Sequence, residues 1–289
     1  MKEPAGARRV VPLTLGWEDL PKSVSVHGAP ASERLREPVP GVLVELDGGW
    51  LLLDTGFNPA LIRDPPLYAR FHGRNHDIRA ELPPDDGDPL ESALAAVGLE
   101  LDDVVAVAVS HLHNDHAGGL RHFAGRVPVH AQRREVEYGL AHHPEPEANG
   151  IFRVDFDDPL IDWRLADGDA ELAPGVTALA TYGHTPGHQS FAVQLAGGGG
   201  YVFAFDAADL QENIDEELAV GGFIGVDPAE TVEQIRRLKA IAAERGLRLV
   251  PGHDPVVWPA LADELRGAGL ADSGRADAGR ADSGLADAG

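Results

Sequence analysis

Hydrophobic residues occur in short runs that end at turn-forming residues, a pattern typical of β-strands. The runs at 42–46 and 50–54 are separated by Asp47-Gly48-Gly49 and predict a β-hairpin. The stretch 104–110 is apolar without alternation and predicts a buried strand. Further strands are expected at 176–181, 191–195 and 201–205.

Helical patterns lie between these strands, and they are expected at 89–98, 132–141 and 228–246. In the last of them apolar residues recur at helical spacing. Asp227 stands where a helix cap is expected, and Gly246 follows the predicted end. Strands and helices that alternate, with a hairpin among them, favour an α/β fold with two sheets packed face to face and helices outside.

Three segments lack a clear period. The segments 57–88 and 142–160 are expected to be long loops, which are usually lids, binding loops or disordered segments. The end of the chain repeats the pentads LADSG, RADAG, RADSG and LADAG, which contain no aromatic or β-branched residue. Such repeats cannot bury enough apolar surface to order themselves. We therefore predict one folded domain over 1–268 and a disordered tail over 269–289.

The charge and composition exclude several classes of protein. Asp and Glu number 47 against 24 Lys and Arg, a formal net charge of −23, which argues against nucleic acid or an anionic membrane as partner. The chain has no cysteine, so disulfides, thiolate nucleophiles and iron–sulfur clusters are excluded. The first residues lack a signal-peptide core and no stretch approaches 18 apolar residues, so a cytoplasmic protein is predicted.

The candidate chemistry begins in the motif SHLHNDHAGG at 110–119, directly after a predicted buried strand. Residues i and i+2 of an extended chain point the same way, so His111 and His113 are expected to bind one ion. The chain then turns, and Asp115 and His116 are expected to face a second ion nearby. Gly118-Gly119 are expected to permit a tight backbone after them.

Further candidate ligands each follow an apolar strand. They are His184 in GHTPGH, Asp206 in FDAAD and His253 in PGHD. Alone, each is more often an ordinary loop residue than a ligand. Together with the first motif they form a set of nitrogen and carboxylate donors without a thiol. Such a set suits zinc, with iron, manganese and cobalt as alternatives.

These motifs resemble those of the metallo-β-lactamase superfamily, and the resemblance extends from the hairpin at 42–54 to His253. It implies an αββα sandwich, two packed mixed sheets with helices outside and two metal ions at one edge. It implies that the first ion is bound by His111, His113 and His184, the second by Asp115, His116 and His253, and that Asp206 bridges both. It also implies that Asp54 and His188 support the metal-binding loops without binding an ion.

Two cations that share a carboxylate lower the pKa of a bridging water to roughly 7, which provides hydroxide at neutral pH. Asp115 is expected to relay the proton to the leaving group. This chemistry predicts a metal-dependent hydrolase of an ester, lactone, thioester, amide or phosphate ester.

Within the superfamily the chain is most similar to the quorum-quenching N-acyl-homoserine lactonases, by the segments 54–59, 110–119, 183–190 and 205–223. This implies hydrolysis of a small-molecule lactone, a carboxylic ester, by a monomer or homodimer. A glyoxalase-II-like thioesterase or another carboxylic ester hydrolase of the same fold is the alternative, although 255–265 lacks the basic patch expected for glutathione. A non-catalytic metal-binding scaffold is the alternative of another class.

The chain departs from the lactonase pattern at two positions. Those enzymes commonly carry a Tyr three residues after the bridging Asp, where this chain has Asp209. They often carry an aromatic residue between the second His and the Asp, where this chain has Asn114. Both make the expected pocket more polar. Tyr68 and Phe71, in the long segment before the metal motif, are expected to line the pocket.

Overall fold

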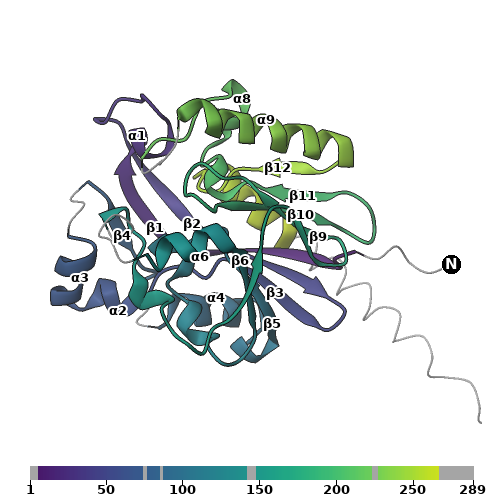
Figure 1. The fold of residues 1–289 in the computed structure, drawn as a ribbon, viewed down its shortest axis with the longest axis horizontal. Helices are drawn as coiled ribbons and strands as arrows, with labels where there is room; N and C mark the ends of the chain where they lie inside the picture. Colours follow the sequence, from purple (N-terminus) through teal and green to yellow (C-terminus); the bar gives the residue numbers. More distant parts are fainter. Residues whose placement is uncertain (1–5, 74–76, 85–86, 142–147, 223–226, 267–289) are drawn as a thin grey trace, which may run out of the picture.

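The computed structural model describes residues 6–73, 77–84, 87–141, 148–222 and 227–266. The predicted tail at 269–289 lies outside these ranges. Two β-sheets pack face to face, with helices against their outer faces (Figure 1). The predicted αββα sandwich is therefore confirmed.

The larger sheet is mixed. Its strand order is β4 (Arg79–Glu81), β1 (Arg9–Pro21), β2 (Arg34–Leu46), β3 (Gly49–Leu53), β5 (Val104–Ala108), β6 (Pro128–Gln132) and β7 (Asp162–Ala166). The predicted hairpin is the antiparallel pair β2–β3, in which Val42 lies opposite Leu53. The strands β3, β5, β6 and β7 run parallel to one another.

The smaller sheet has the order β12 (Arg248–Val250), β11 (Gly200–Phe203), β10 (Gln189–Gln194), β9 (Val176–Ala180) and β8 (Ala170–Ala173). Only the pair of β11 and β12 is parallel; the other pairs are antiparallel. The three strands predicted at 176–181, 191–195 and 201–205 are β9, β10 and β11.

The two-residue period of the strands decides what each face contacts. Val42 and Val44 of β2 point between the sheets and belong to the same cluster as Phe191 and Val193 of β10. Leu43, between them in sequence, belongs to the cluster on the opposite face, where α4 (Pro89–Ala96) packs. This part of β2 is therefore apolar on both faces because each face of the larger sheet is covered here.

The helix α9 (Pro228–Arg245) covers the outer face of the smaller sheet. Its residues Ile235, Leu238 and Ala242 belong to one buried cluster with side chains of β9 and β11. The side chain of Asp227 accepts a hydrogen bond from the amide of Ala229, and the chain leaves the helix at Gly246 with φ 65°. The predicted helix and both of its end signals are confirmed.

The remaining helices are short. They are α1 (Lys22–Ser25), α2 (Pro59–Arg63), α3 (Pro65–Phe71), α5 (Asn114–Ala117), α6 (Arg133–Gly139) and α8 (Gln211–Glu216), with 3₁₀ turns η1 (Leu101–Asp103), η2 (Leu120–His122), η3 (Arg153–Asp155) and η4 (Phe205–Ala207). Residues 257–266 are also helical. No helix in the described ranges has the length and apolarity to cross a membrane.

The segment 57–88 is not a loop throughout, contrary to the sequence expectation: it contains α2, α3 and β4. Asn58 caps α2 and Asp64 caps α3, and each is followed by a proline at the first helical position. These are local start signals for a helix. Helices of five and seven residues are too short to show a period, which is why the pattern missed them. In the other predicted loop, 142–147 lie outside the described residues, and 148–160 contain η3.

Candidate metal centre

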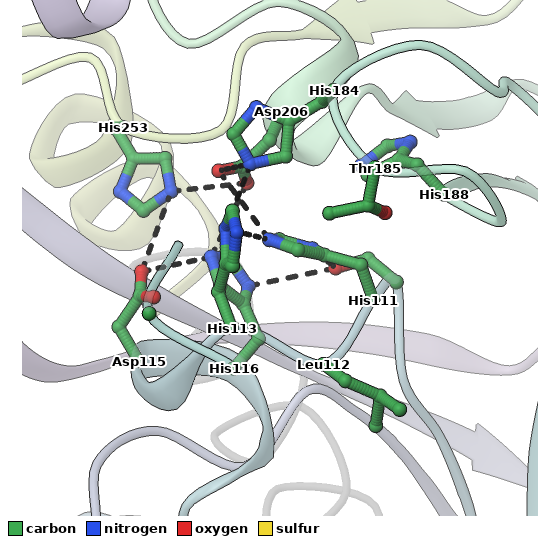
Figure 2. A network of polar contacts seen from close by, with 12 residues as sticks. His111, Leu112, His113, Asp115, His116, His184, Thr185, His188, Asp206 and His253 are labelled. Carbon is green, nitrogen blue, oxygen red and sulfur yellow. Dashed lines mark hydrogen bonds and ion pairs between the residues drawn. The ribbon is translucent and has the colours of Figure 1, made fainter. Parts of the chain in front are cut away.

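The seven predicted ligands converge at one edge of the two sheets (Figure 2). The loop after β5 and the short helix α5 supply four of them, the loop between β9 and β10 supplies one, η4 supplies one, and the loop after β12 supplies the last. All seven side chains are buried: His111, His113, Asp115, His116, His184, Asp206 and His253. Strand ends from both sheets therefore meet at a single point.

The first group contains His111, His113, His184 and Asp206, whose ligand atoms all lie within 4.8 Å of one another. Nδ1 of His113 is 2.9 Å from Nε2 of His111 and also 2.9 Å from Nε2 of His184. A single imidazole nitrogen offers one lone pair or one N–H and cannot serve both neighbours well. Three nitrogens directed at a common point fit a metal ion better than they fit a hydrogen-bond network.

The second group contains Asp115, His116 and His253. Nε2 of His116 is 2.8 Å from Oδ2 of Asp115. Nδ1 of His253 donates to the carbonyl of Pro38, at 3.0 Å, which turns its Nε2 toward the group. These three donors match a second cation site.

Asp206 lies between the two groups and divides its oxygens between them. Oδ2 is 3.2 Å from Nε2 of His184, in the first group. Oδ1 is 3.2 Å from Nε2 of His116 and 3.1 Å from Nε2 of His253, in the second. This is the placement expected of a carboxylate that bridges two ions.

The histidines of the first group are held neutral. Burial lowers the pKa of His113 to about 4, and it lowers the pKa of His111 and His184 well below the usual range. Neutral imidazole is the form that binds a metal. Burial also opposes the charged form of His253, but the carboxylate of Asp206 outweighs it and raises the pKa of His253 to about 10. A cation bound here would compete with that proton.

Two strained turns lie at the metal centre, one next to the ligand Asp206 and one at Asp54, which supports His116. Asp54 and Phe205 are non-glycine residues with positive φ, 57° and 48°. Asp54 follows β3, and Phe205 immediately precedes Asp206. Such conformations are costly and tend to occur at functional sites.

The residues expected to support the loops lie next to the groups. Asp54 is fully buried, and its carboxylate accepts from Nδ1 of His116 at 2.7 Å and from the amide of Ser110 at 2.6 Å. Nδ1 of His188 is 2.9 Å from Oγ1 of Thr181, across the base of the loop that carries His184. Neither Asp54 nor His188 belongs to the two ligand groups.

Glu135 was not predicted from the sequence. It lies in α6, and its side chain bonds to two of the loops that carry metal ligands. Its carboxylate accepts from the amide of Leu112 at 3.0 Å, from the hydroxyl of Thr185 at 2.7 Å and from the amide of Gly187 at 2.9 Å. A Cβ on Gly187 would lie 2.2 Å from the backbone nitrogen of Glu135. Nothing around Glu135 in the sequence marks it, because its partners come from two distant loops.

Glycine is required at positions 118 and 119 for a reason other than the one expected from the sequence. Their φ angles, −63° and −89°, are ordinary for any residue. Space is what requires glycine: a Cβ on Gly118 would lie 2.1 Å from the nitrogen of Asn58, and one on Gly119 would lie 2.5 Å from the carbonyl oxygen of Thr55. The turn after the metal motif therefore packs directly on the backbone that follows β3.

A cavity opens above the ligands, with about 760 Å³ of free space that includes its mouth. Phe71, Asn114 and Asp209 line it. Tyr68 is not among the described residues that line it; its ring stacks on His72, which does, with ring centroids 5.4 Å apart. Two acidic residues, Glu18 and Glu37, also line the cavity and were not foreseen.

The metallo-beta-lactamase superfamily model matches residues 35–253 of this chain. The chain belongs to the metallo-β-lactamase superfamily. An N-acyl homoserine lactonase of Bacillus thuringiensis is 33% identical over 220 residues, which are 76% of this chain and 82% of that protein. The N-acyl homoserine lactonase AttM of Azorhizobium caulinodans is 33% identical over 231 residues, which are 77% and 84% of the two chains.

A solved structure shows the same relationship in space. It is an N-acyl homoserine lactone hydrolase with the product N-hexanoyl-L-homoserine at its catalytic metal centre. It superposes with a TM-score of 0.74 at 28% identity and covers 86% of this chain and 94% of its own. The prediction of a metal-dependent hydrolase of this superfamily, with a two-metal site of His and Asp residues, is confirmed.

Proposed function

We propose that this protein hydrolyses a lactone ring to the open-chain hydroxy acid, and that N-acyl-homoserine lactones are its first candidate substrates. One observation carries the proposal. Two ligand groups share Asp206 in a chain that is one third identical, over most of its length, to lactonases.

The donor set fits two divalent cations, zinc in the first place and iron, manganese or cobalt as alternatives. His111, His113 and His184 would hold one ion, and Asp115, His116 and His253 the other, with Asp206 shared. Bound there, the two ions would supply an activated water and an electrophile for the carbonyl oxygen.

Asp115 is the residue we assign to proton transfer. Burial raises the pKa of its carboxyl, and the contact of 2.8 Å between its Oδ2 and Nε2 of His116 opposes this and lowers it. Asp115 also lines the cavity. An ionised carboxylate at the base of the substrate cavity can accept a proton from water and return it to the ring oxygen as the ester bond breaks.

Other residues are placed to orient the substrate. Phe71 and Phe152 are buried with ring centroids 5.1 Å apart, and both line the cavity, where they offer a surface for an apolar chain. Nδ2 of Asn114 donates to the carbonyl of Gly150 at 3.2 Å, and its buried Oδ1 has no hydrogen-bond partner among the described residues. That oxygen can accept an N–H from a bound amide.

The test uses metal-loaded protein with short- and long-chain N-acyl-homoserine lactones, a glutathione thioester, a phosphodiester and a β-lactam. Acid release is expected from the lactones. Asp115→Asn protein that retains its metals should lose about 10²–10⁴-fold in kcat, since an amide does not relay a proton. Asp47→Asn, in the exposed turn after β2, is the matched control.

Two results would replace the proposal. Cleavage of the thioester with the lactones left intact would identify the thioesterase alternative. Bound metal with no hydrolysis of any substrate would identify the scaffold alternative.

A further inference from the structure

Three carboxyl side chains that bind no metal in the proposed scheme line the same cavity: Glu18, Glu37 and Asp209. Glu18 of β1 and Glu37 of β2 are direct partners across the antiparallel strand pair. Glu37 is 1% exposed and Asp209 is 4% exposed. Two carboxyls directly opposite each other destabilise a sheet when both are ionised. A bound group of positive charge would relieve that cost.

One of these carboxyls, that of Asp209, has incomplete hydrogen bonding. Oδ1 of Asp209 is buried and has no hydrogen-bond partner among the described residues. The side chain of Glu37 accepts one bond, from the hydroxyl of Ser25 at 2.6 Å. Of the described residues that line the cavity, none is Lys or Arg. Burial of an unpaired carboxylate is unfavourable, so the free oxygen of Asp209 is suited to a positively charged donor from outside the protein.

A small metal ion does not fit this cluster. In the part of the chain that the structure describes, only two groups of three or more His, Asp or Glu residues have ligand atoms within 4.8 Å of one another. Neither group includes Glu18, Glu37 or Asp209. The three carboxyls are spread more widely than the ligands of one ion. An organic ammonium does not need all three acceptors at once: it can donate to one or two of these carboxyls and still be attracted by the charge of the third.

The cluster lies beside the reaction centre. Asp209 follows Asp206 by three residues, and its backbone carbonyl accepts from the amide of His253 at 2.8 Å. A group bound by Asp209 therefore lies close to the metal ligands.

We infer that the preferred substrate is a lactone that carries a protonated amine near its scissile carbonyl, and that Glu18, Glu37 and Asp209 bind this amine. The inference rests on the proposed lactonase function. It distinguishes this chain from an enzyme that selects its substrate by the apolar acyl chain alone. The same cluster discriminates against anionic substrates, including glutathione thioesters.

Three homoserine lactones with small acyl groups of different charge test the inference at neutral pH: N-glycyl (cationic), N-acetyl (neutral) and N-succinyl (anionic, and longer by a carboxymethyl group). For metal-loaded wild-type protein, we expect kcat/KM for the N-glycyl lactone to exceed that for the N-acetyl lactone at least about tenfold, the size of one charge-assisted hydrogen bond. The N-succinyl lactone should be the slowest of the three.

The residues are tested with a Glu18→Gln, Asp209→Asn double variant, which keeps the size of both side chains. The preference for the N-glycyl over the N-acetyl lactone should fall to within about twofold, since neutral acceptors bind an ammonium more weakly. Glu45→Gln is the matched control: Glu45 lies on β2 as Glu37 does, but pairs with Arg9 at the far end of the strand. This control should keep the wild-type preference.

The outcomes separate the two proposals. A wild-type protein that opens the N-acetyl lactone as fast as the N-glycyl lactone overturns the inference and leaves the lactonase function standing, and so does a double variant that keeps the preference. Failure to open any of the three lactones overturns both. If the double variant does not fold, inhibition of the wild-type protein by the corresponding N-glycyl and N-acetyl lactams decides the matter: equal inhibition constants would contradict a site for the amine.

Discussion

Oδ2 of Asp54 accepts a hydrogen bond of 2.7 Å from Nδ1 of His116, and both side chains are completely buried. The same carboxylate accepts from the amide and the hydroxyl of Ser110. These bonds fix the imidazole so that Nε2 is directed at Asp115 and Asp206. A residue at the end of β3 thus orients a ligand that lies 62 positions later in the chain.

Removal of the negative charge at Asp54 should weaken the second metal site. In Asp54→Asn protein, we expect the affinity for the second ion to fall about 10–100-fold, as is typical when the partner of a ligating histidine is lost. The first ion should remain. Metal content measured against a graded chelator checks this, with Asp47→Asn as the control. Equal loss of both ions, or of neither, would contradict the assigned role.

The two ligand groups predict that two substitutions reduce the bound metal differently. His111→Ala should remove mainly one ion, because His111 belongs to the first group alone. Asp206→Ala should weaken both, since its oxygens face both groups. Elemental analysis of loaded and dialysed protein gives the ions per chain. His27→Ala, at an exposed position, should retain two. A single ion in fully loaded wild-type protein would refute the two-metal arrangement.

The metal ligands could be predicted from the sequence because each stands directly after an apolar run. A strand that ends at a sheet edge brings its next residues to that edge, so the motifs at 110–119, 183–188, 205–209 and 251–254 meet without any knowledge of the loops. The choice of ligands was narrowed further because, in a chain without cysteine, few residue types bind a metal.

The acidic side of the cavity could not be predicted in the same way. Glu18 and Glu37 lie in the long strands β1 and β2, and only the pairing register places them opposite each other. The strand β1 was itself missed, because Pro12, Gly16 and a register shift between Thr14 and Trp17 interrupt its pattern. Long-range pairing has no local signature, so the residues that depend on it emerge only in the folded chain.

Asp209→Tyr should change which lactone is preferred. The substitution removes one carboxyl of the cluster and offers a phenol O–H to an acyl carbonyl. We expect the KM for a long-chain N-acyl-homoserine lactone to fall about 2–10-fold, the value of one neutral hydrogen bond, while the advantage of the N-glycyl lactone is reduced. Asp209→Phe is the matched control without the hydroxyl. If the Phe variant lowers this KM equally, the hydrogen bond is not the cause.

The last prediction concerns Asp155, a buried acid in η3 that lies outside both ligand groups. Its Oδ1 accepts from Nδ2 of Asn58 at 2.8 Å, and its buried Oδ2 has no hydrogen-bond partner among the described residues. Burial raises the pKa of Asp155 to about 7, against the opposing effects of Asn58 and Arg121. The folded chain therefore holds this proton to a higher pH than the unfolded chain does.

Because the folded pKa is the higher one, the stabilisation is complete below pH about 4 and is lost as the pH rises to about 7. Between pH 5 and pH 8, the wild-type free energy of unfolding should therefore fall relative to that of Asp155→Asn by about 2–3 kcal/mol, since the amide does not titrate. Denaturant unfolding of both proteins at each pH, in the same metal-loaded form, measures this difference and cancels the titration of the metal ligands. Asp157→Asn, in the same segment but exposed to solvent, should unfold with the wild-type pH dependence. Parallel pH profiles for wild-type and Asp155→Asn protein would show that Asp155 is ionised in the folded chain throughout this range.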